Sequence, residues 1–187
     1  MTAPKPASPP EKAPVPTPPR VTLVLGGARS GKSRHAEGLV ARLPSPWLYV
    51  ATAESFDDEM RKRIDEHRRR RDGRWRTIEA PRELAQVIRA EAGRGAPMLV
   101  DCLTLWLSNV MLAGADVERA CGELLAALGD TAGPVVLVSN EVGWGIVPET
   151  ALARAFRDAQ GVLNSRVAEI AGHVVLVAAG LPLALKS

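Results

Sequence analysis

The chain contains the stretch Gly26-Gly27-Ala28-Arg29-Ser30-Gly31-Lys32-Ser33, which matches the pattern GxxxxGK(S/T) at every fixed position. An aliphatic run, Val21 to Leu25, stands directly before it, and a segment with helical periodicity follows it. In this setting the glycines let successive backbone N–H groups turn inward around phosphate oxygens. Lys32 can neutralise the terminal phosphates, and the Ser33 hydroxyl can coordinate the accompanying Mg²⁺. The motif therefore predicts a P-loop that binds a nucleoside triphosphate.

Further aliphatic runs follow the P-loop, each about the length of a strand buried on both faces. They span 47–51, 98–100, 135–138 and 174–177, and 75–78 offers one more short strand. Helices are expected at about 32–43, 55–71, 81–92, 103–128 (interrupted near residue 114) and 149–171. This alternation predicts an α/β fold of three layers, in which helices flank a mostly parallel central sheet. The apolar stretch 174–185, which Gly180 and Pro182 break, is interpreted as a buried strand and a turn.

The composition suits a single globular domain. The chain has 187 residues, enough for one sizeable core. Residues 1–20 hold eight of the fifteen prolines and are expected to form a disordered or extended tail, which leaves 21–187 as one domain. The tail also carries +2 of the net charge of +3. A body so close to neutral offers no global argument for binding nucleic acid or a membrane surface.

Cysteine content and the N-terminal sequence indicate the compartment. Cys102 and Cys121 stand apart with no CxxC, which argues against a disulfide framework and against a zinc site. The longest apolar stretch falls short of a membrane-spanning helix, and the N-terminal residues lack the apolar centre of a secretory signal. A cytoplasmic protein is therefore expected.

Asp101 is the candidate for a second magnesium ligand. It closes the aliphatic run 98–100, as a Walker B aspartate does. An aspartate in this position is by itself as often a helix cap or a turn former. Together with the P-loop it favours a Mg²⁺ site shared with Ser33. These features do not choose among kinases, ATPases and transferases.

A basic segment is the strongest compositional anomaly of the body. Residues 61–76 hold nine basic residues against three acidic ones, and a helix here would place His67 on one face with Met60 and Ile64. Three interpretations are open: a solvated basic helix with a packed histidine, a nucleic-acid surface, or a polyphosphate site in which His67 is a nucleophile or an acid/base group. In the third, a neutral imidazole attacks an α-phosphorus, forms a phosphoramidate and expels pyrophosphate. Arginines would offset the negative charge of the triphosphate.

The motifs together resemble one family over 21–187. They are 26–37, 49–53, 57–60 with Arg63, Ile64 and His67, 75–77 with Glu79, 139–143 with 145–148, and 153–154 with 156–158. In these segments the chain resembles the bifunctional adenosylcobinamide kinase/adenosylcobinamide-phosphate guanylyltransferases of cobalamin biosynthesis. The resemblance implies a RecA-like P-loop NTPase fold, a cytoplasmic homotrimer, and two reactions. ATP or GTP phosphorylates adenosylcobinamide, and GTP then donates GMP through a covalent histidine intermediate to adenosylcobinamide phosphate.

The resemblance also implies a set of site residues. The catalytic residues are His67 and Lys32, and the Mg²⁺ ligands are Ser33 and Asp101. The nucleotide contacts are Gly26, Gly27, Ala28, Arg29, Ser30, Gly31, Lys32, Ser33, Thr52, Ala53, Glu54, Arg69, Arg70, Arg71, Asp72, Glu79 and Asp101. Where some members carry a His-His pair, this chain has Glu66-His67, so His67 is the candidate for the covalent residue. Ser165 replaces a glutamine that relatives often carry after Asn164.

Two alternatives stay open at this point. A plain P-loop small-molecule kinase would transfer the γ-phosphate and would never carry a GMP adduct. A nucleic-acid-binding ATPase would use the arginine-rich segment, and its affinity would fall steeply with salt. The near-neutral body weighs against the second of these, so no nucleic-acid partner is expected.

Overall fold

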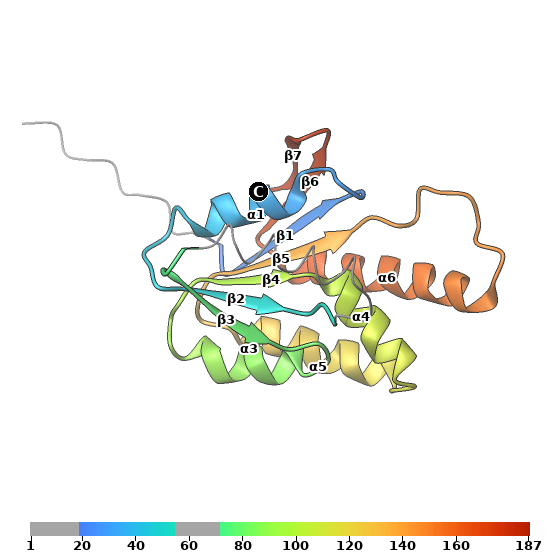
Figure 1. Cartoon of the computed structure of the whole chain (residues 1–187), viewed down its shortest axis with the longest axis horizontal. Coiled ribbons are helices and arrows are strands. Elements are labelled where there is room, and N and C mark those ends of the chain that lie inside the picture. Colours follow the sequence, from blue (N-terminus) through green and yellow to red (C-terminus); the bar gives the residue numbers. More distant parts are fainter. Residues whose placement is uncertain (1–18, 55–71) are drawn as a thin grey trace, which may run out of the picture.

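The computed structural model describes residues 19–54 and 72–187, and its strands form one seven-stranded sheet (Figure 1). The strands are β1 (Val21–Gly26), β2 (Trp47–Ala51), β3 (Trp75–Glu79), β4 (Met98–Asp101), β5 (Val135–Asn140), β6 (His173–Ala178) and β7 (Leu181–Lys186). Their order is β3-β2-β4-β5-β1-β6-β7, and every neighbouring pair runs parallel except the antiparallel pair β6 and β7.

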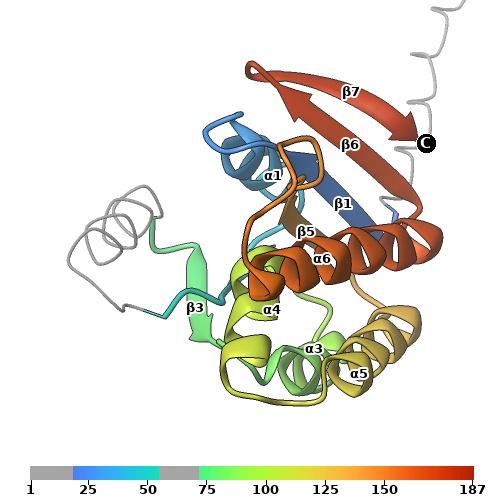
Figure 2. The same ribbon diagram turned by 90° about the vertical axis from the view of Figure 1, so that its right-hand side faces the viewer.

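Helices cover both faces of this sheet. The helix α1 (Lys32–Val40) lies on one face, as Figure 2 shows, and the other face carries α3 (Leu84–Ala92), α4 (Leu103–Leu112), α5 (Val117–Asp130) and α6 (Ala151–Ile170). Two apolar cores fill the layers. The larger packs the sheet against α3 to α6 and includes Leu23 and Trp106, and the smaller packs it against α1 and includes Val24 and Val40. The predicted three-layer α/β fold with a mostly parallel sheet is confirmed.

Local sequence explains where two of the helices that cover the larger core begin. Asp116 caps α5 by accepting a hydrogen bond from the backbone N–H of Arg119 at 3.0 Å. Thr150 caps α6 in the same way, accepting from Ala153 N at 3.2 Å. The interruption expected near residue 114 is the loop between α4 and α5, where Gly114 has φ 66°. Only glycine adopts this conformation at little cost.

The strand β7 is the element that the sequence did not predict. The turn before it was expected at Gly180, which has φ 80° beside Ala179 with φ 50°. The strand itself is exposed along its whole length and contains Pro182, so it has neither a buried face nor the composition of a central strand. The tail at 1–18 and the helix expected at 55–71 lie outside the described residues. Within the described residues, every helix is too short or too polar to cross a membrane.

Candidate active site

The P-loop joins the end of β1 to the start of α1. Gly31 has φ 94° at the N-cap of α1, and no side chain caps the helix there. Ser30 N donates to the Gly27 carbonyl at 3.3 Å, and Lys32 Nζ donates to the same oxygen at 3.0 Å. The first-turn N–H groups of α1 are therefore not used by a capping side chain, and they carry the positive end of the helix dipole. This is the geometry of an anion site.

The base of the P-loop is closed and its rim is open. A Cβ at Gly26 would lie 2.5 Å from Ser30 Oγ and 2.6 Å from the Val177 carbonyl oxygen, so the position has no room for a side chain. A Cβ at Gly27 would meet nothing within 4 Å. Ser30 Oγ is buried and has no hydrogen-bond partner among the described residues. A buried hydroxyl of this kind is a donor that a phosphate oxygen would satisfy.

The turn between β6 and β7 supports the P-loop from outside. Gly180 N donates to the Ser30 carbonyl at 2.8 Å. A Cβ at Gly31 would lie 3.4 Å from Gly180 Cα, which shows how closely the two backbones approach. The antiparallel hairpin therefore holds the loop that surrounds the expected phosphates.

The carboxyl ends of the parallel strands bring most of the expected site residues to one edge of the sheet. The strand register pairs Ala51 with both Glu79 and Asp101, and it pairs Gly26 with Asn140. The expected contacts at 52–54 follow directly after β2, so they lie on the same edge. Open parallel sheets bind ligands at this edge.

Some expected contacts are not brought to this edge. Asp72 precedes β3 and lies at the opposite end of that strand, where its carboxylate accepts hydrogen bonds from Arg74 Nη2 at 2.7 Å and Nε at 3.0 Å. The expected residues His67, Arg69, Arg70 and Arg71 lie outside the described residues.

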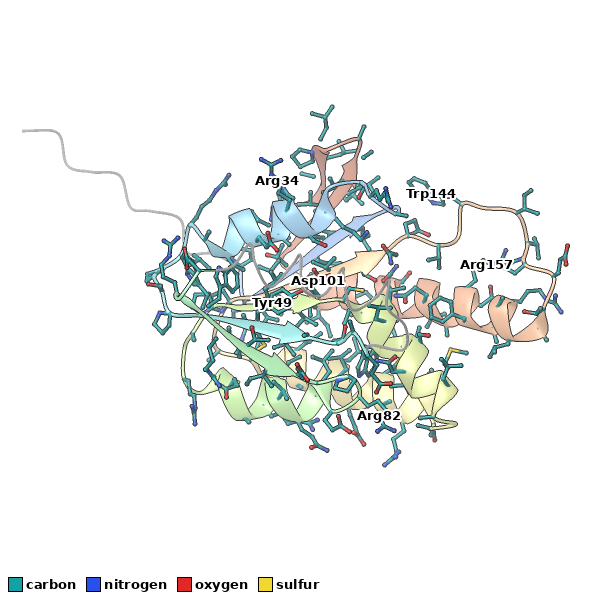
Figure 3. All side chains as sticks on the ribbon, viewed as in Figure 1. Arg34, Tyr49, Arg82, Asp101, Trp144 and Arg157 are labelled. Atoms are coloured by element: carbon teal, nitrogen blue, oxygen red, sulfur yellow. The ribbon has the colours of Figure 1, made fainter. Side chains whose placement is uncertain are left out.

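Asp101 ends β4, separated from the P-loop strand by β5 alone. Tyr49 Oη donates to Asp101 Oδ2 at 3.3 Å, and Figure 3 shows the two side chains near each other. Tyr49 belongs to a motif that resembles the family, but its contact with Asp101 was not expected. Asp101 and Ser33 are both half-buried and offer a carboxylate and a hydroxyl. Such hard oxygen ligands, completed by phosphate oxygens and water, suit Mg²⁺.

Both cysteines are protonated thiols at neutral pH. Burial and, secondly, the Asp101 carboxylate raise the pKa of the Cys102 thiol to about 11, against the opposing effects of backbone hydrogen bonds from Leu105 and Thr104 and, more weakly, of the Lys32 charge. Burial and, secondly, Glu118 raise the pKa of Cys121 to about 11. The thiolate is the nucleophilic form, so neither cysteine is a good candidate for a covalent intermediate.

A buried polar cluster fixes the backbone just after β2. Thr52 is fully buried, and its Oγ1 accepts a hydrogen bond from Cys102 N and donates one to Cys102 O, both at 2.7 Å. Asn109 Nδ2 donates to the Thr52 carbonyl at 2.8 Å and to the Pro81 carbonyl at 3.1 Å. The sequence signal for this role was a single amide in the otherwise mostly apolar helix α4. The cluster holds in place the point from which the segment carrying His67 departs.

We expect Asn109→Ala to lower the free energy of unfolding by about 2 to 4 kcal/mol, because it leaves two carbonyl oxygens without their donor. Urea denaturation measures this change. Ser108→Ala, on the same helix and half-buried, is the matched control and should change the free energy of unfolding by less than about 1 kcal/mol. Equal effects of the two substitutions would contradict the role given to the Asn109 amide.

A second polar cluster joins the end of β5 to α6. Ser139 Oγ donates to Asn164 Oδ1 at 2.6 Å, and Gln160 Nε2 donates to both of those oxygens at 3.0 Å. Asn164 Nδ2 donates in turn to the Asn140 carbonyl at 3.1 Å, and Asn140 N donates to Thr104 Oγ1 at 2.8 Å. Asn164 therefore fixes the last residue of the strand next to the P-loop. No local sequence pattern indicated this role of Asn164.

Solved structures with similar architecture share the fold. An ATPase of the type III secretion system of pathogenic bacteria superposes with a TM-score of 0.54 at 10% identity, covering 84% of this chain and 50% of that chain. A Pyrococcus horikoshii OT3 protein superposes with a TM-score of 0.52 at 8% identity, and the match covers 90% of this chain and 86% of that protein's chain. At such identities the likeness shows the P-loop NTPase fold alone.

Sequence relatives are much more similar. The protein CobP of Pseudomonas aeruginosa, described as a bifunctional adenosylcobalamin biosynthesis protein, is 50% identical over 167 residues, which are 88% of this chain and 96% of that protein. CobU of Salmonella typhimurium, with the same description, is 43% identical over 179 residues, and the match covers 88% of this chain and 98% of that protein. The family model of cobinamide kinase / cobinamide phosphate guanyltransferase matches residues 22–185. With a P-loop and an acidic strand end at one edge of its sheet, the chain belongs to this family of bifunctional cobinamide kinases and cobinamide phosphate guanyltransferases.

Proposed function

We propose that one P-loop serves both reactions of the family in this chain. In the first, ATP or GTP phosphorylates the aminopropanol hydroxyl of adenosylcobinamide. In the second, GTP gives GMP to His67, which passes it to adenosylcobinamide phosphate. The observation that carries the proposal is the P-loop geometry, with its closed base at Gly26 and uncapped start of α1, in a chain whose match to the family model spans residues 22–185.

In the kinase step the P-loop holds the donor phosphates. The backbone N–H groups at the start of α1 and the buried Ser30 hydroxyl donate hydrogen bonds to phosphate oxygens, and Lys32 neutralises charge on the terminal phosphate. Ser33 and Asp101 would hold Mg²⁺, which neutralises further charge and orients the phosphates when it is bound. The acceptor oxygen forms a bond to the γ-phosphorus and its hydroxyl proton passes to water. The bond between the γ-phosphorus and the bridging β-phosphate oxygen breaks, and the nucleoside diphosphate leaves.

In the guanylyl step an imidazole nitrogen of His67 attacks the α-phosphorus of GTP. The nitrogen–phosphorus bond forms, the bond to the β-phosphate oxygen breaks, and pyrophosphate leaves. A phosphate oxygen of adenosylcobinamide phosphate then displaces the imidazole and gives adenosylcobinamide-GDP. Support for His67 comes from the family resemblance, from the arginines at 69–71, and from the two cysteines being neutral thiols. Ala53, Glu54 and Glu79 are proposed nucleotide contacts because they lie on the P-loop edge of the sheet. Thr52 is fully buried and its hydroxyl bonds to Cys102, so its proposed role is to hold this edge in place instead of contacting the nucleotide.

Intact-mass measurement after exposure to GTP tests this function. The protein should gain the mass of one GMP, and peptide mapping should place it on His67. Because a phosphoramidate is the expected linkage, acid should release the GMP and base should leave it attached. A wild-type protein that phosphorylates adenosylcobinamide but never gains GMP would be a plain kinase, and the proposal would fail.

The assembly and the location of the enzyme are also proposals. We propose that residues 21–187 act as a single catalytic domain, because strands from residues 21 to 186 share one sheet. The family resemblance supports a homotrimer that works in the cytoplasm. Residues 1–20 are then an appendage to this domain.

A further inference from the structure

The segment 141–150 links β5 to α6, and its first residue lies beside the P-loop. Glu141 N donates to the carbonyl of Gly26 at 3.2 Å, which ties the start of the segment to the first P-loop residue. At its other end, Arg154 Nη1 donates to the carbonyls of residues 148 and 149 at 2.9 and 2.7 Å. Both ends of the segment are therefore anchored by hydrogen bonds. Figure 1 shows the segment extending beyond the carboxyl ends of the strands before it turns back to α6.

The middle of this segment presents large apolar side chains to solvent. Trp144 is 78% exposed, Ile146 97% and Val147 59%. Single exposed apolar residues are ordinary on protein surfaces, but three within four residues on an anchored loop form a patch of the kind that binds a ligand or partner. We call these three residues the apolar crest. Figure 3 shows Trp144 on the loop between β5 and α6, with its side chain directed out into solvent.

A shallow hollow lies next to the crest. Gly143 and one face of α6 line this open hollow of about 500 Å³, whose surface is largely apolar and to which Arg157, Asp158 and Ser165 contribute polar groups. These side chains offer a guanidinium, a carboxylate and a hydroxyl, so the hollow both donates and accepts hydrogen bonds. In Figure 3, Arg157 lies on α6 beneath the arch of the segment. A ligand with a broad apolar body and a polar rim would match the crest and the hollow together.

We propose that the apolar crest and the hollow beside it form the binding surface for the corrinoid acceptor. A corrinoid is a broad macrocycle with apolar faces and carboxamide side chains at its periphery. It is too large for the hollow alone, so its body must lie across a surface while its carboxamides reach polar groups. Its aminopropanol hydroxyl must also reach the terminal phosphate at the P-loop, and the segment that carries the crest starts beside that loop, where Glu141 N donates to the Gly26 carbonyl. The inference rests on the proposed function, since it takes a corrinoid as the acceptor.

Steady-state kinase kinetics of a Trp144→Ala/Ile146→Ala variant test the inference. The KM for adenosylcobinamide should rise about tenfold or more, because the variant loses apolar area that the acceptor would bury. The KM for the nucleotide should stay within a few-fold of the wild-type value, because the P-loop is untouched. A Trp144→Phe variant should recover most of the acceptor affinity by restoring an aromatic face. Leu112→Ala is the matched control: Leu112 is 65% exposed at the end of α4, on the face of the sheet opposite α1, and its loss should leave both KM values unchanged.

Two outcomes of these experiments would overturn the inference. One is an unchanged KM for adenosylcobinamide in the double variant. The other is a smaller molecular mass of that variant in sedimentation equilibrium, which would show that the crest is a contact between copies of this chain. Formation of the GMP adduct from GTP alone needs no acceptor, so it tests the proposed function separately. A wild-type protein that forms the adduct while the double variant keeps its acceptor affinity would contradict the binding surface alone.

Discussion

A His67→Ala variant is expected to form no covalent GMP adduct when it is exposed to GTP, and to keep phosphorylating adenosylcobinamide. The methyl group of alanine offers no nucleophile, and the two thiols stay protonated at neutral pH, so nothing should replace the imidazole. The proposed kinase step uses the P-loop, Lys32, Ser33 and Asp101, none of which the substitution removes. Intact mass after GTP exposure and a separate assay with γ-labelled donor measure the two activities.

The control for this experiment is His173→Ala. His173 starts β6, on the far side of the P-loop strand from β5, and has no proposed role in the chemistry. That variant should form the adduct as the wild type does. Label that persists on His67→Ala would remove the role assigned to His67, and peptide mapping would then identify the true acceptor. Loss of both activities in His67→Ala would indicate a structural effect instead of a chemical one.

Gly26→Ala should lower both activities by about 100-fold or more, because preorganised phosphate contacts supply much of the catalysis in such sites. The added Cβ would lie 2.5 Å from Ser30 Oγ and 2.6 Å from a backbone carbonyl, so the loop must shift. Gly27→Ala, one residue on, adds the same methyl group where nothing lies within 4 Å, and should cost only a few-fold. Initial rates of both reactions, with denaturation curves for both variants, measure the difference.

This pair of glycine variants also tests whether one P-loop serves both nucleotides. If Gly26→Ala lost the kinase activity but still gained GMP at the wild-type rate, the GTP of the second step would bind elsewhere. Equal losses in Gly26→Ala and Gly27→Ala would contradict the closed base of the loop. The proposed function requires a large loss of both reactions in the first variant and a small loss in the second.

The sequence was informative wherever a local pattern has one physical solution. The run before Gly26 and the motif after it predict strand, P-loop and helix, because glycines and a lysine at this spacing serve few other structures. Buried parallel strands are continuous apolar runs, so β2, β4 and β5 were also evident. Asp101 was expected to end a buried strand because it closes such a run, and the structure places it at the carboxyl end of β4.

Features that depend on distant parts of the chain were not predictable in this way. Asn109 and Thr52 meet across 57 residues, and Ser139 meets Asn164 across 25, so no local pattern reveals either contact. The strand β7 lacks a buried face and therefore lacks the apolar signal of the other strands. Asp72 was expected to contact the nucleotide together with its sequence neighbours at 69–71. It precedes β3, however, so it lies at the end of that strand opposite the P-loop.

The hydrogen bond from Gly180 to Ser30 has a practical consequence for handling this protein. An affinity tag, a fusion partner or a protease cut that pulls residues 181–186 away from β6 would also release the brace on the phosphate loop. Catalytic parameters from material altered at that end would then describe a loosened enzyme. Attachments placed ahead of β1 avoid this contact, which makes that side the better choice for purification.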